Sequence, residues 1–247
     1  MNRIEAVRTF YGVLEKLGQR TGGPFLLSDC SGRLPWPGRG VYFFFEPGEL
    51  RSESGHGPRV VRIGTHALGE GSGTTLWNRL SQHAGTRKAG SGNHRGSIFR
   101  LLLGEAMKRR DDTEEPRSWG IGGDPGTAAT RLGYSRDQVK ASELDLERAV
   151  TRYVCAMPFL FVAVEDDPGP NSARGRIERN AIALLSNYKG ARVDPAGSSW
   201  LGNSSGRERV RESGLWNSNH VDESYDEAFL DLFAAAVEAT APLRGTA

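Results

Sequence analysis

Cysteine and long apolar runs are the two features that this sequence most clearly lacks. It holds two cysteines in 247 residues, Cys30 and Cys155, with no Cys-x-x-Cys pair, so neither a disulfide framework nor a cysteine-rich zinc site is supported. No run approaches the roughly 20 apolar residues that span a bilayer, and the amphipathic N-terminal segment lacks the apolar centre of a signal peptide. We therefore expect a cytoplasmic protein without membrane contact.

The chain also lacks a strong excess of charge of either sign. Its 32 Lys and Arg residues nearly balance its 30 Asp and Glu residues, which leaves a formal net charge of +2. A nucleic-acid partner therefore has to be argued from local clusters of basic residues and not from the overall charge. With 37% hydrophobic and 25% charged residues, the composition is that of a folded protein, and the length suits one core with insertions.

Hydrophobic periodicity predicts a mixture of helices and strands. Apolar residues at spacings of three or four predict helices, and compact aromatic or β-branched runs predict strands. The expected strands cover residues 41–45, 60–64 and 157–164, and the expected helices cover residues 4–17, 76–83, 97–110, 142–150, 176–185 and 229–237. Thr74 or Thr75 is the expected N-cap of the second of these helices. Residues 111–139 lack sustained periodicity, so we expect mostly loop there.

This order predicts an α+β fold in which a small three-stranded central sheet is flanked by helices, with helical and loop insertions. We divide the chain into an N-terminal helix and linker (1–39), a core (40–190) that holds an insertion (111–150), and a C-terminal extension with a closing helix (191–247). The insertion and residues 196–222 are the segments that we expect to select the target.

Polar residues stand at the start or on the face of several of these elements, in an order that points to one family. Gly40-Val41-Tyr42 resembles the first half-motif of the GIY-YIG nucleases, and Arg62-Ile63-Gly64 resembles the second. Arg79 stands on the following helix, where that family keeps an arginine. Glu178 matches the family's metal-binding glutamate. The resemblance covers roughly residues 40–190 and implies a GIY-YIG-like core.

The resemblance is closest to one branch and departs from the family at one position. Arg79 and His83 lie four residues apart and share one helical face. This pair, within the tract RIGTHALGEGSGTTLWNRLSQH, is similar to the restriction-endonuclease branch, which implies restriction or phage defence. Asn187 follows the last core helix roughly where the family keeps an asparagine. Arg62 replaces the tyrosine of the second half-motif, so a mechanism with two tyrosines is not expected.

The residue types also suit phosphodiester hydrolysis on chemical grounds. The reaction needs an activated water, stabilisation of charge on the phosphate oxygens and help for the leaving oxygen. Tyr42 is the expected general base, with its phenolate stabilised by Arg62 and His83. Arg79 offers a planar guanidinium fork to phosphate oxygens. Glu178 supplies a hard oxygen ligand for Mg²⁺ or Mn²⁺, whose shell water and substrate phosphate complete.

Each of these assignments has a structural alternative. Tyr42 could be ordinary packing in an aromatic strand, Glu178 could complement a helix dipole, and Arg79 with His83 could form a solvated helix face. Their joint order along the expected elements favours a metal-dependent endonuclease. Two alternatives stay open: a catalytically silent DNA-binding protein, and a protein-interaction module on the same fold.

The expected partner is double-stranded DNA. His94 and Arg95 lie in a Gly-rich basic loop, where contact with backbone phosphate is expected. Arg207, Arg211 and Asn217 lie in a segment whose composition suits contact with phosphates and base edges. The alternatives are a solvated loop for the first segment and a cap over the core for the second. A homodimer with two sites would cut both strands more easily.

Overall fold

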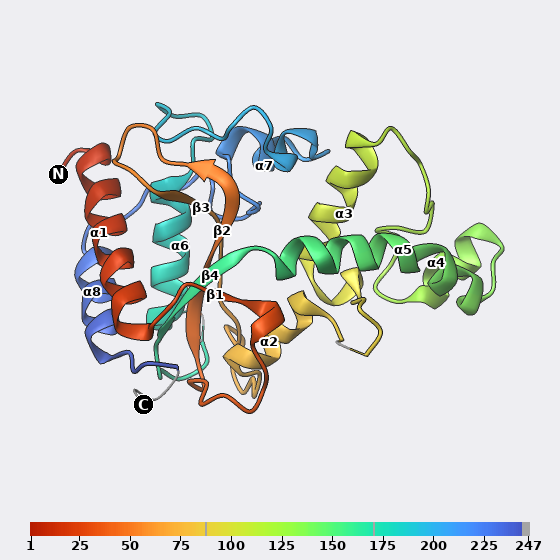
Figure 1. Ribbon diagram of the computed structural model, residues 1–247, viewed down its shortest axis with the longest axis horizontal. Helices are drawn as coiled ribbons and strands as arrows, with labels where there is room; N and C mark the ends of the chain where they lie inside the picture. The colour runs from red at the N-terminus through yellow and green to blue at the C-terminus, as the bar shows by residue number, and fades with distance from the viewer. Residues whose placement is uncertain (87, 170, 244–247) are drawn as a thin grey trace.

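The computed structural model describes residues 1–86, 88–169 and 171–243. Its helices and strands follow in the order α1 (Arg3–Thr21), β1 (Phe25–Leu26), β2 (Gly40–Leu50), β3 (Pro58–Gly64), α2 (Leu76–Ala84), α3 (Ile98–Arg110), α4 (Pro125–Leu132), α5 (Arg136–Cys155), β4 (Pro158–Ala163), α6 (Ala173–Leu185), α7 (Glu208–Ser213) and α8 (Phe229–Ala239). Short 3-10 helices lie at η1 (Leu27–Asp29), η2 (His94–Gly96) and η3 (Leu201–Ser204). The predicted α+β class is confirmed (Figure 1).

The sheet has the strand order β1-β4-β2-β3, and every pair in it is antiparallel. The three predicted strands are β2, β3 and β4. The fourth, β1, is a two-residue strand paired with the outer side of β4, too short for any periodicity to reveal. Tyr42 lies opposite Gly64 on β3 and opposite Phe161 on β4. It therefore stands in the middle of the sheet.

Strand β2 sends alternate side chains to opposite faces of the sheet, as strand geometry requires. Val41, Phe43 and Phe45 enter one hydrophobic core, whereas Tyr42 and Phe44 enter another. The sheet thus separates two cores, and the face to which Tyr42 belongs is fixed by the position of its hydrophobic neighbours in the sequence.

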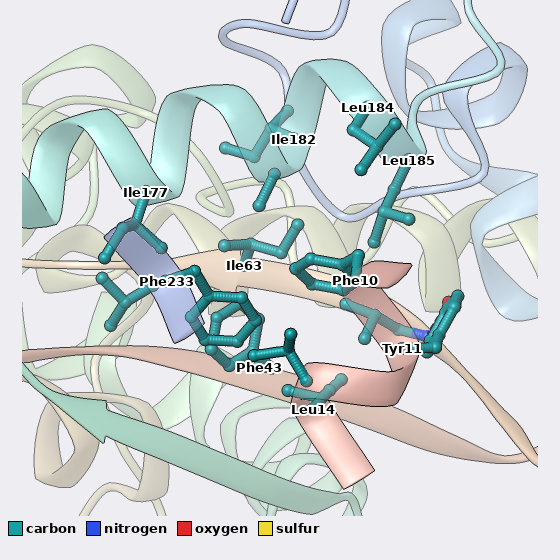
Figure 2. Close-up of a cluster of buried hydrophobic side chains, with 14 of the residues drawn as sticks. Phe10, Tyr11, Leu14, Phe43, Ile63, Ile177, Ile182, Leu184, Leu185 and Phe233 are labelled. Atoms are coloured by element: carbon teal, nitrogen blue, oxygen red, sulfur yellow. Dashed lines mark hydrogen bonds between the residues drawn. The ribbon is translucent and has the colours of Figure 1, made fainter. Parts of the chain in front are cut away.

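The first core is covered by α1, α6 and α8, which lie together on the left in Figure 1. Figure 2 shows Phe10 of α1, Ile177 of α6 and Phe233 of α8 closing around Phe43. The ring centroid of Phe43 lies 5.8 Å from that of Phe10 and 5.4 Å from that of Phe233. Full burial of each such ring contributes roughly 1.5–3 kcal/mol, so this core anchors α6 firmly against the sheet.

The second core lies on the opposite face, against α2, α3 and α5. Leu80 of α2 and Phe99 of α3 pack there with Phe44 and Trp216, and the rings of Phe44 and Phe99 are 5.5 Å apart. Because Tyr42 shares this face, its hydroxyl is directed toward the helices of the second core.

A helical lobe formed by α3, α4 and α5 extends to the right of the sheet in Figure 1. The prediction of mostly loop over residues 111–139 was wrong for α4 and for the first turn of α5. Their end signals are in the sequence: Asp124 and Pro125 begin α4, and Ser135 forms a capping box with Gln138 of α5. Periodicity missed α4 because the residues it buries are Ala128 and Ala129.

Both ends of the chain contribute to the first core. Helix α1 packs against α8, and residues from both lie in the same cluster as Phe43. Segments outside residues 40–190 thus complete a core that this range alone leaves uncovered. The boundaries of the three proposed segments stay a prediction. Residues 244–247, the end of the proposed C-terminal extension, lie outside the described part of the chain.

None of the helices in the described ranges combines the length with the hydropathy that a membrane crossing demands.

Candidate active site

The centre of the site is a hydrogen bond between strand β2 and helix α2. The hydroxyl of Tyr42 lies 2.8 Å from Nε2 of His83, and both side chains are fully buried. The other ring nitrogen of His83, Nδ1, lies 2.7 Å from Oγ of Ser97, the N-cap residue of α3. A continuous line of hydrogen-bonding groups therefore runs from the sheet through α2 to the start of α3.

Helix α2 positions two of the predicted residues on neighbouring turns. Thr75 caps its N-terminus by accepting a hydrogen bond from the backbone N–H of Asn78, as predicted. Arg79 and His83 follow on one face. Arg79 is half-buried and donates through Nη1 to the carbonyl of Gly96, 3.3 Å away, and to a side-chain oxygen of Gln82. Its Nε is buried without a hydrogen-bond partner.

Gly64 makes room for the phenol. A Cβ added to Gly64 would lie 2.2 Å from the hydroxyl oxygen of Tyr42 and 2.4 Å from its Cζ. No real Cβ makes such a contact, so the Tyr42 ring lies directly against the backbone of the second half-motif. The glycine at this position is a requirement of that packing.

His83 is held in its neutral form. Burial lowers its pKa well below 6.5, and the positive charges of Arg79, Arg62 and Arg100 lower it further. A neutral imidazole carries one N–H and one acceptor nitrogen. In the tautomer that carries its N–H on the Ser97 side, Nε2 accepts a hydrogen bond from the Tyr42 hydroxyl.

Arg62 occupies the position of the missing second tyrosine. It is buried, donates through Nη1 to the carbonyl of Trp216, and places its guanidinium carbon 5.6 Å from the ring centroid of Phe99. Its Nε has no hydrogen-bond partner. Arg62 thus supplies a fixed positive charge that acts on the pKa of both His83 and Glu178.

Glu178 enters from α6 on the opposite side of β3. Its Oε1 accepts a hydrogen bond from the backbone N–H of Thr65, at 3.2 Å. Burial raises the pKa of this carboxyl, and the positive charges of Arg62, His220 and Arg79, together with the Thr65 N–H, oppose the rise. The same two arginines thus act on Glu178 and on His83, which brings the four predicted side chains into one electrostatic neighbourhood.

Glu178 offers Mg²⁺ or Mn²⁺ a single carboxylate ligand, with no cluster of further ligands among the described residues. In residues 1–86, 88–169 and 171–243, no group of three or more His, Cys, Asp or Glu side chains could hold a metal ion. Mg²⁺ nevertheless keeps several waters and binds through one or two carboxylates together with substrate phosphate. Glu178 alone would therefore hold the ion, and the substrate would complete its shell.

The structure places His94 and Arg95 inside the helical lobe and not on an open loop. Both oxygens of Glu143 accept from Arg95, at 2.6 and 2.7 Å, and the Arg95 side chain is 2% exposed. His94 is 1% exposed, lies 2.9 Å from an oxygen of Glu147 and stacks on Trp119 with ring centroids 3.9 Å apart. Both terminal nitrogens of Arg95 and the imidazole of His94 thus have partners within the protein, and only the Nε of Arg95 is buried without one.

Two predicted asparagines are also used internally. Asn217 pairs with the backbone of Ile63: its side-chain oxygen accepts the N–H at 3.1 Å and its amide donates to the carbonyl at 2.9 Å. Asn187 bonds to the backbone of Val193 and to Arg3. Because nine residues of mostly helical chain separate it from Glu178, the two lie roughly 13 Å apart along the axis. The structure does not bring Asn187 to the carboxylate.

Arg207 and Arg211 lie around α7, on the upper side of the view in Figure 1. Arg207 is 39% exposed and pairs with Glu105 at 3.4 Å. Arg211 is half-buried and donates to the carbonyl of Ser205 at 2.7 Å. Both side chains are thus partly exposed, whereas that of Arg95 is buried.

Sequence reasoning missed three groups that belong to this site. Ser97 supports His83, and its signal was available as the cap before an apolar helix. His220 acts on the pKa of Glu178 from a segment 42 positions later, which no spacing rule connects. His66 lies two residues after the second half-motif. It is 6% exposed, and neither ring nitrogen has a hydrogen-bond partner.

Comparison with known proteins identifies the family of this chain. Neither the curated proteins nor the solved structures contain a match to the chain. Among the known protein families, one matches residues 1–243 and is described as the GIY-YIG domain. Since this match spans nearly the whole chain, the protein belongs to the GIY-YIG domain family.

Proposed function

We propose that this protein is a metal-dependent endonuclease that hydrolyses phosphodiester bonds in double-stranded DNA. The observation that carries the proposal is the buried hydrogen bond between Tyr42 and His83, with Arg79 and Glu178 in the same electrostatic neighbourhood. Membership of the GIY-YIG family, which typically comprises nucleases, supports the same reaction. A phenol, an imidazole, a guanidinium and a carboxylate are the groups that hydrolysis of a phosphodiester needs.

Each side chain has a distinct part in this proposal. Tyr42 accepts a proton from the attacking water, either as the phenolate or while passing its own proton to neutral His83. Arg79 and Arg62 stabilise negative charge on the equatorial phosphate oxygens. Because Tyr42 and His83 are fully covered in the free protein, we propose that DNA binding opens a path for water to the phenol.

Glu178 would hold Mg²⁺ or Mn²⁺ beside the scissile phosphate. When bound, the ion stabilises charge on the phosphate and on the leaving oxygen. The raised pKa of Glu178 makes this carboxyl easier to protonate than an exposed glutamate. As the solution is acidified, the ion should therefore dissociate at a higher pH than it would from a glutamate with an ordinary pKa.

The proposed DNA contacts outside the centre are Arg207 and Arg211, which are partly exposed near α7. We leave His94, Arg95 and Asn217 out of this set, because their polar groups bond within the protein. A restriction or phage-defence role remains a proposal that rests on the tract from Arg62 to His83. Cutting both strands would be served by a homodimer that presents two sites.

Cleavage of supercoiled plasmid by the purified protein tests the proposal. We expect nicked and linear products with Mg²⁺ or Mn²⁺, none with EDTA, and none from Glu178→Gln or Arg79→Ala. Arg131→Ala, at an exposed position of α4, is the matched control and should cut normally. DNA binding without cleavage would instead support the silent DNA-binding alternative, and absence of both would support the protein-interaction module.

A further inference from the structure

His66 is a buried histidine whose two ring nitrogens lack hydrogen-bond partners. It lies two residues after Gly64, where the chain leaves β3, and it is 6% exposed. The carbonyl of Gly38 lies near enough to raise its pKa but is not in hydrogen-bond geometry. Buried polar groups in folded proteins nearly always have partners, and exceptions often mark sites that a ligand completes.

The charges of three arginines act on this histidine. Burial lowers the pKa of His66 to about 4, and the charges of Arg174, Arg39 and Arg79 all act in the same direction. Each of these three guanidiniums is therefore close enough to His66 for its charge to act on the ring. A neutral imidazole among cations is poorly placed to attract a fourth cation and well placed to meet an anion.

Two of the three arginines are already committed to nearby acidic groups and carbonyls. Arg174 is fully buried, lies 2.7 Å from a carboxylate oxygen of Asp166 and donates to the carbonyl of Ala67 at 3.0 Å. Arg39 donates to the carbonyl of Asp166. These contacts fix the loop that carries His66, and they leave the negative charge of Asp166 matched by Arg174.

Arg79 differs from the other two in that it binds neither Asp166 nor any other residue of the His66 loop. Its hydrogen bonds go to neutral oxygens of Gln82 and Gly96, and its Nε is buried without a partner. Gly38, whose carbonyl lies near His66, accepts a hydrogen bond at 3.0 Å from the N–H of Leu76, about one turn before Arg79 on α2. An imidazole with no partner and a guanidinium with a spare donor thus lie near the same end of α2. The neighbouring backbone N–H, that of Thr65, holds Glu178.

We propose that His66 and Arg79 form a phosphate subsite that binds a backbone phosphate of DNA next to the scissile one. The inference rests on the proposed function for the identity of the strand, but the chemistry of the subsite is that of a phosphate anion. Phosphate accepts hydrogen bonds from both a guanidinium fork and an imidazole N–H. Binding would satisfy the ring nitrogen and the Arg79 Nε that the free protein leaves without partners.

A first experiment tests phosphate binding without any need for nuclease activity. The imidazole Cε1–H signals of the five histidines are followed by NMR during titration with inorganic phosphate, and the His66 signal is assigned by its loss in His66→Leu. We expect the His66 signal to move in the wild-type protein and to stay still in Arg79→Ala. A His66 signal that does not respond to tens of millimolar phosphate overturns the subsite.

A second experiment measures duplex affinity with Ca²⁺ in place of Mg²⁺, so that binding is seen without cleavage. His66→Leu should weaken binding about tenfold, the loss of one hydrogen bond to a charged group, and leave the salt dependence unchanged. Arg79→Ala should weaken binding and reduce the slope of log affinity against log salt by about 1. His56→Leu, an exposed histidine in the β2–β3 turn, is the matched control.

The outcomes separate this inference from the proposed function. If the wild-type protein cuts DNA while His66→Leu binds the duplex normally, the subsite is wrong and the nuclease proposal stands. If the wild-type protein neither binds nor cuts DNA, the nuclease proposal fails, and the phosphate titration still decides whether His66 and Arg79 bind phosphate. If His66→Leu does not fold, His66→Asn supplies the signal assignment, and the wild-type and Arg79→Ala titrations are the deciding pair.

Discussion

The hydroxyl of Tyr42 and Nε2 of His83 lie 2.8 Å apart, joining the central strand of the sheet to the helix that follows the second half-motif. Both side chains are fully buried, so in the low-dielectric interior the bond is strong and its loss is costly. His83 stays neutral because burial and three arginines lower its pKa. The pair therefore consists of a phenol and a neutral imidazole, and protonation of that imidazole is disfavoured in the free protein.

The ionised carboxylate of Glu178 should destabilise the fold although cleavage requires it. Its folded-state pKa is raised, so the folded state binds the proton more tightly than the unfolded chain and stability falls as pH rises above about 4.5. Glu178→Gln removes the charge and keeps an acceptor for the Thr65 N–H. We expect this variant to lose cleavage, yet to melt a few degrees higher than the wild type at pH 7.5 in EDTA.

The pH dependence of that difference checks the cause. The gap in melting temperature between Glu178→Gln and the wild type should close as pH falls below 4.5, where the wild-type carboxyl is protonated. Glu70→Gln, at an exposed position, should show no gap at any pH. A Glu178→Gln variant less stable than the wild type at pH 7.5 would mean that the carboxylate is a structural ion-pair partner.

Gly64→Ala should damage the site through a single methyl group. The added Cβ would lie 2.2 Å from the Tyr42 hydroxyl, so the phenol must move away from His83, and overpacking of this kind costs roughly 1–3 kcal/mol. We expect lower stability in urea and a loss of cleavage. Gly12→Ala, where an added Cβ meets nothing within 4 Å, is the same change in an open helical position and should stabilise by about 0.5–1 kcal/mol.

The stability of the protein should respond to acid through His66. The pKa of this histidine falls from 6.5 in the unfolded chain to about 4 in the fold. Below pH 6.5 the His66 imidazole is protonated in the unfolded chain but stays neutral in the folded protein. The free energy of unfolding therefore decreases as pH falls from 6.5 toward 4. The drop in melting temperature between pH 7.5 and 5.0 should be smaller for His66→Leu than for the wild type. His56→Leu should behave as the wild type, and equal drops in all three would contradict the shift.

Loss of Arg95 should reduce the stability of the protein, whereas loss of Arg207 should weaken DNA binding. Arg95→Ala leaves Glu143 buried and unpaired, a change that costs about 3–5 kcal/mol. Arg207 is half exposed, and its ion pair with Glu105 is worth at most about 1 kcal/mol. We expect Arg95→Ala to lower the urea midpoint sharply and Arg207→Ala to leave it unchanged while weakening DNA binding. A stable Arg95→Ala protein with weak DNA binding would restore the basic-loop hypothesis.

The sequence contained enough to predict the sheet and its flanking helices, because strong local patterns mark them. The aromatic run at residues 41–45 identified β2, and Thr75 marked the start of α2. What stayed hidden has little local pattern. Strand β1 is two residues long, and α4 buries alanines in place of large apolar side chains.

The candidate site was predictable only in part, for a related reason. Tyr42, Arg79 and Glu178 could be chosen from motifs, but partners that lie far along the chain could not. Arg95 pairs with Glu143, 48 positions away in the sequence, and Asn217 bonds to Ile63, 154 positions away. A basic loop and a buried ion pair look the same in sequence until the fold brings the acid to the arginine.

The proposal that Tyr42 and His83 act as one proton-accepting unit is decided by a double-mutant cycle on single-turnover DNA cleavage. Tyr42→Phe and His83→Asn should each lower the rate by about 10²–10⁴, and because the two act on the same proton, the double variant should be no slower than the worse single variant. Thermal unfolding of each variant confirms that it is folded. Losses that multiply in the double variant, or a Tyr42→Phe protein that cuts at the wild-type rate, would show that the phenol and the imidazole do not form one catalytic unit.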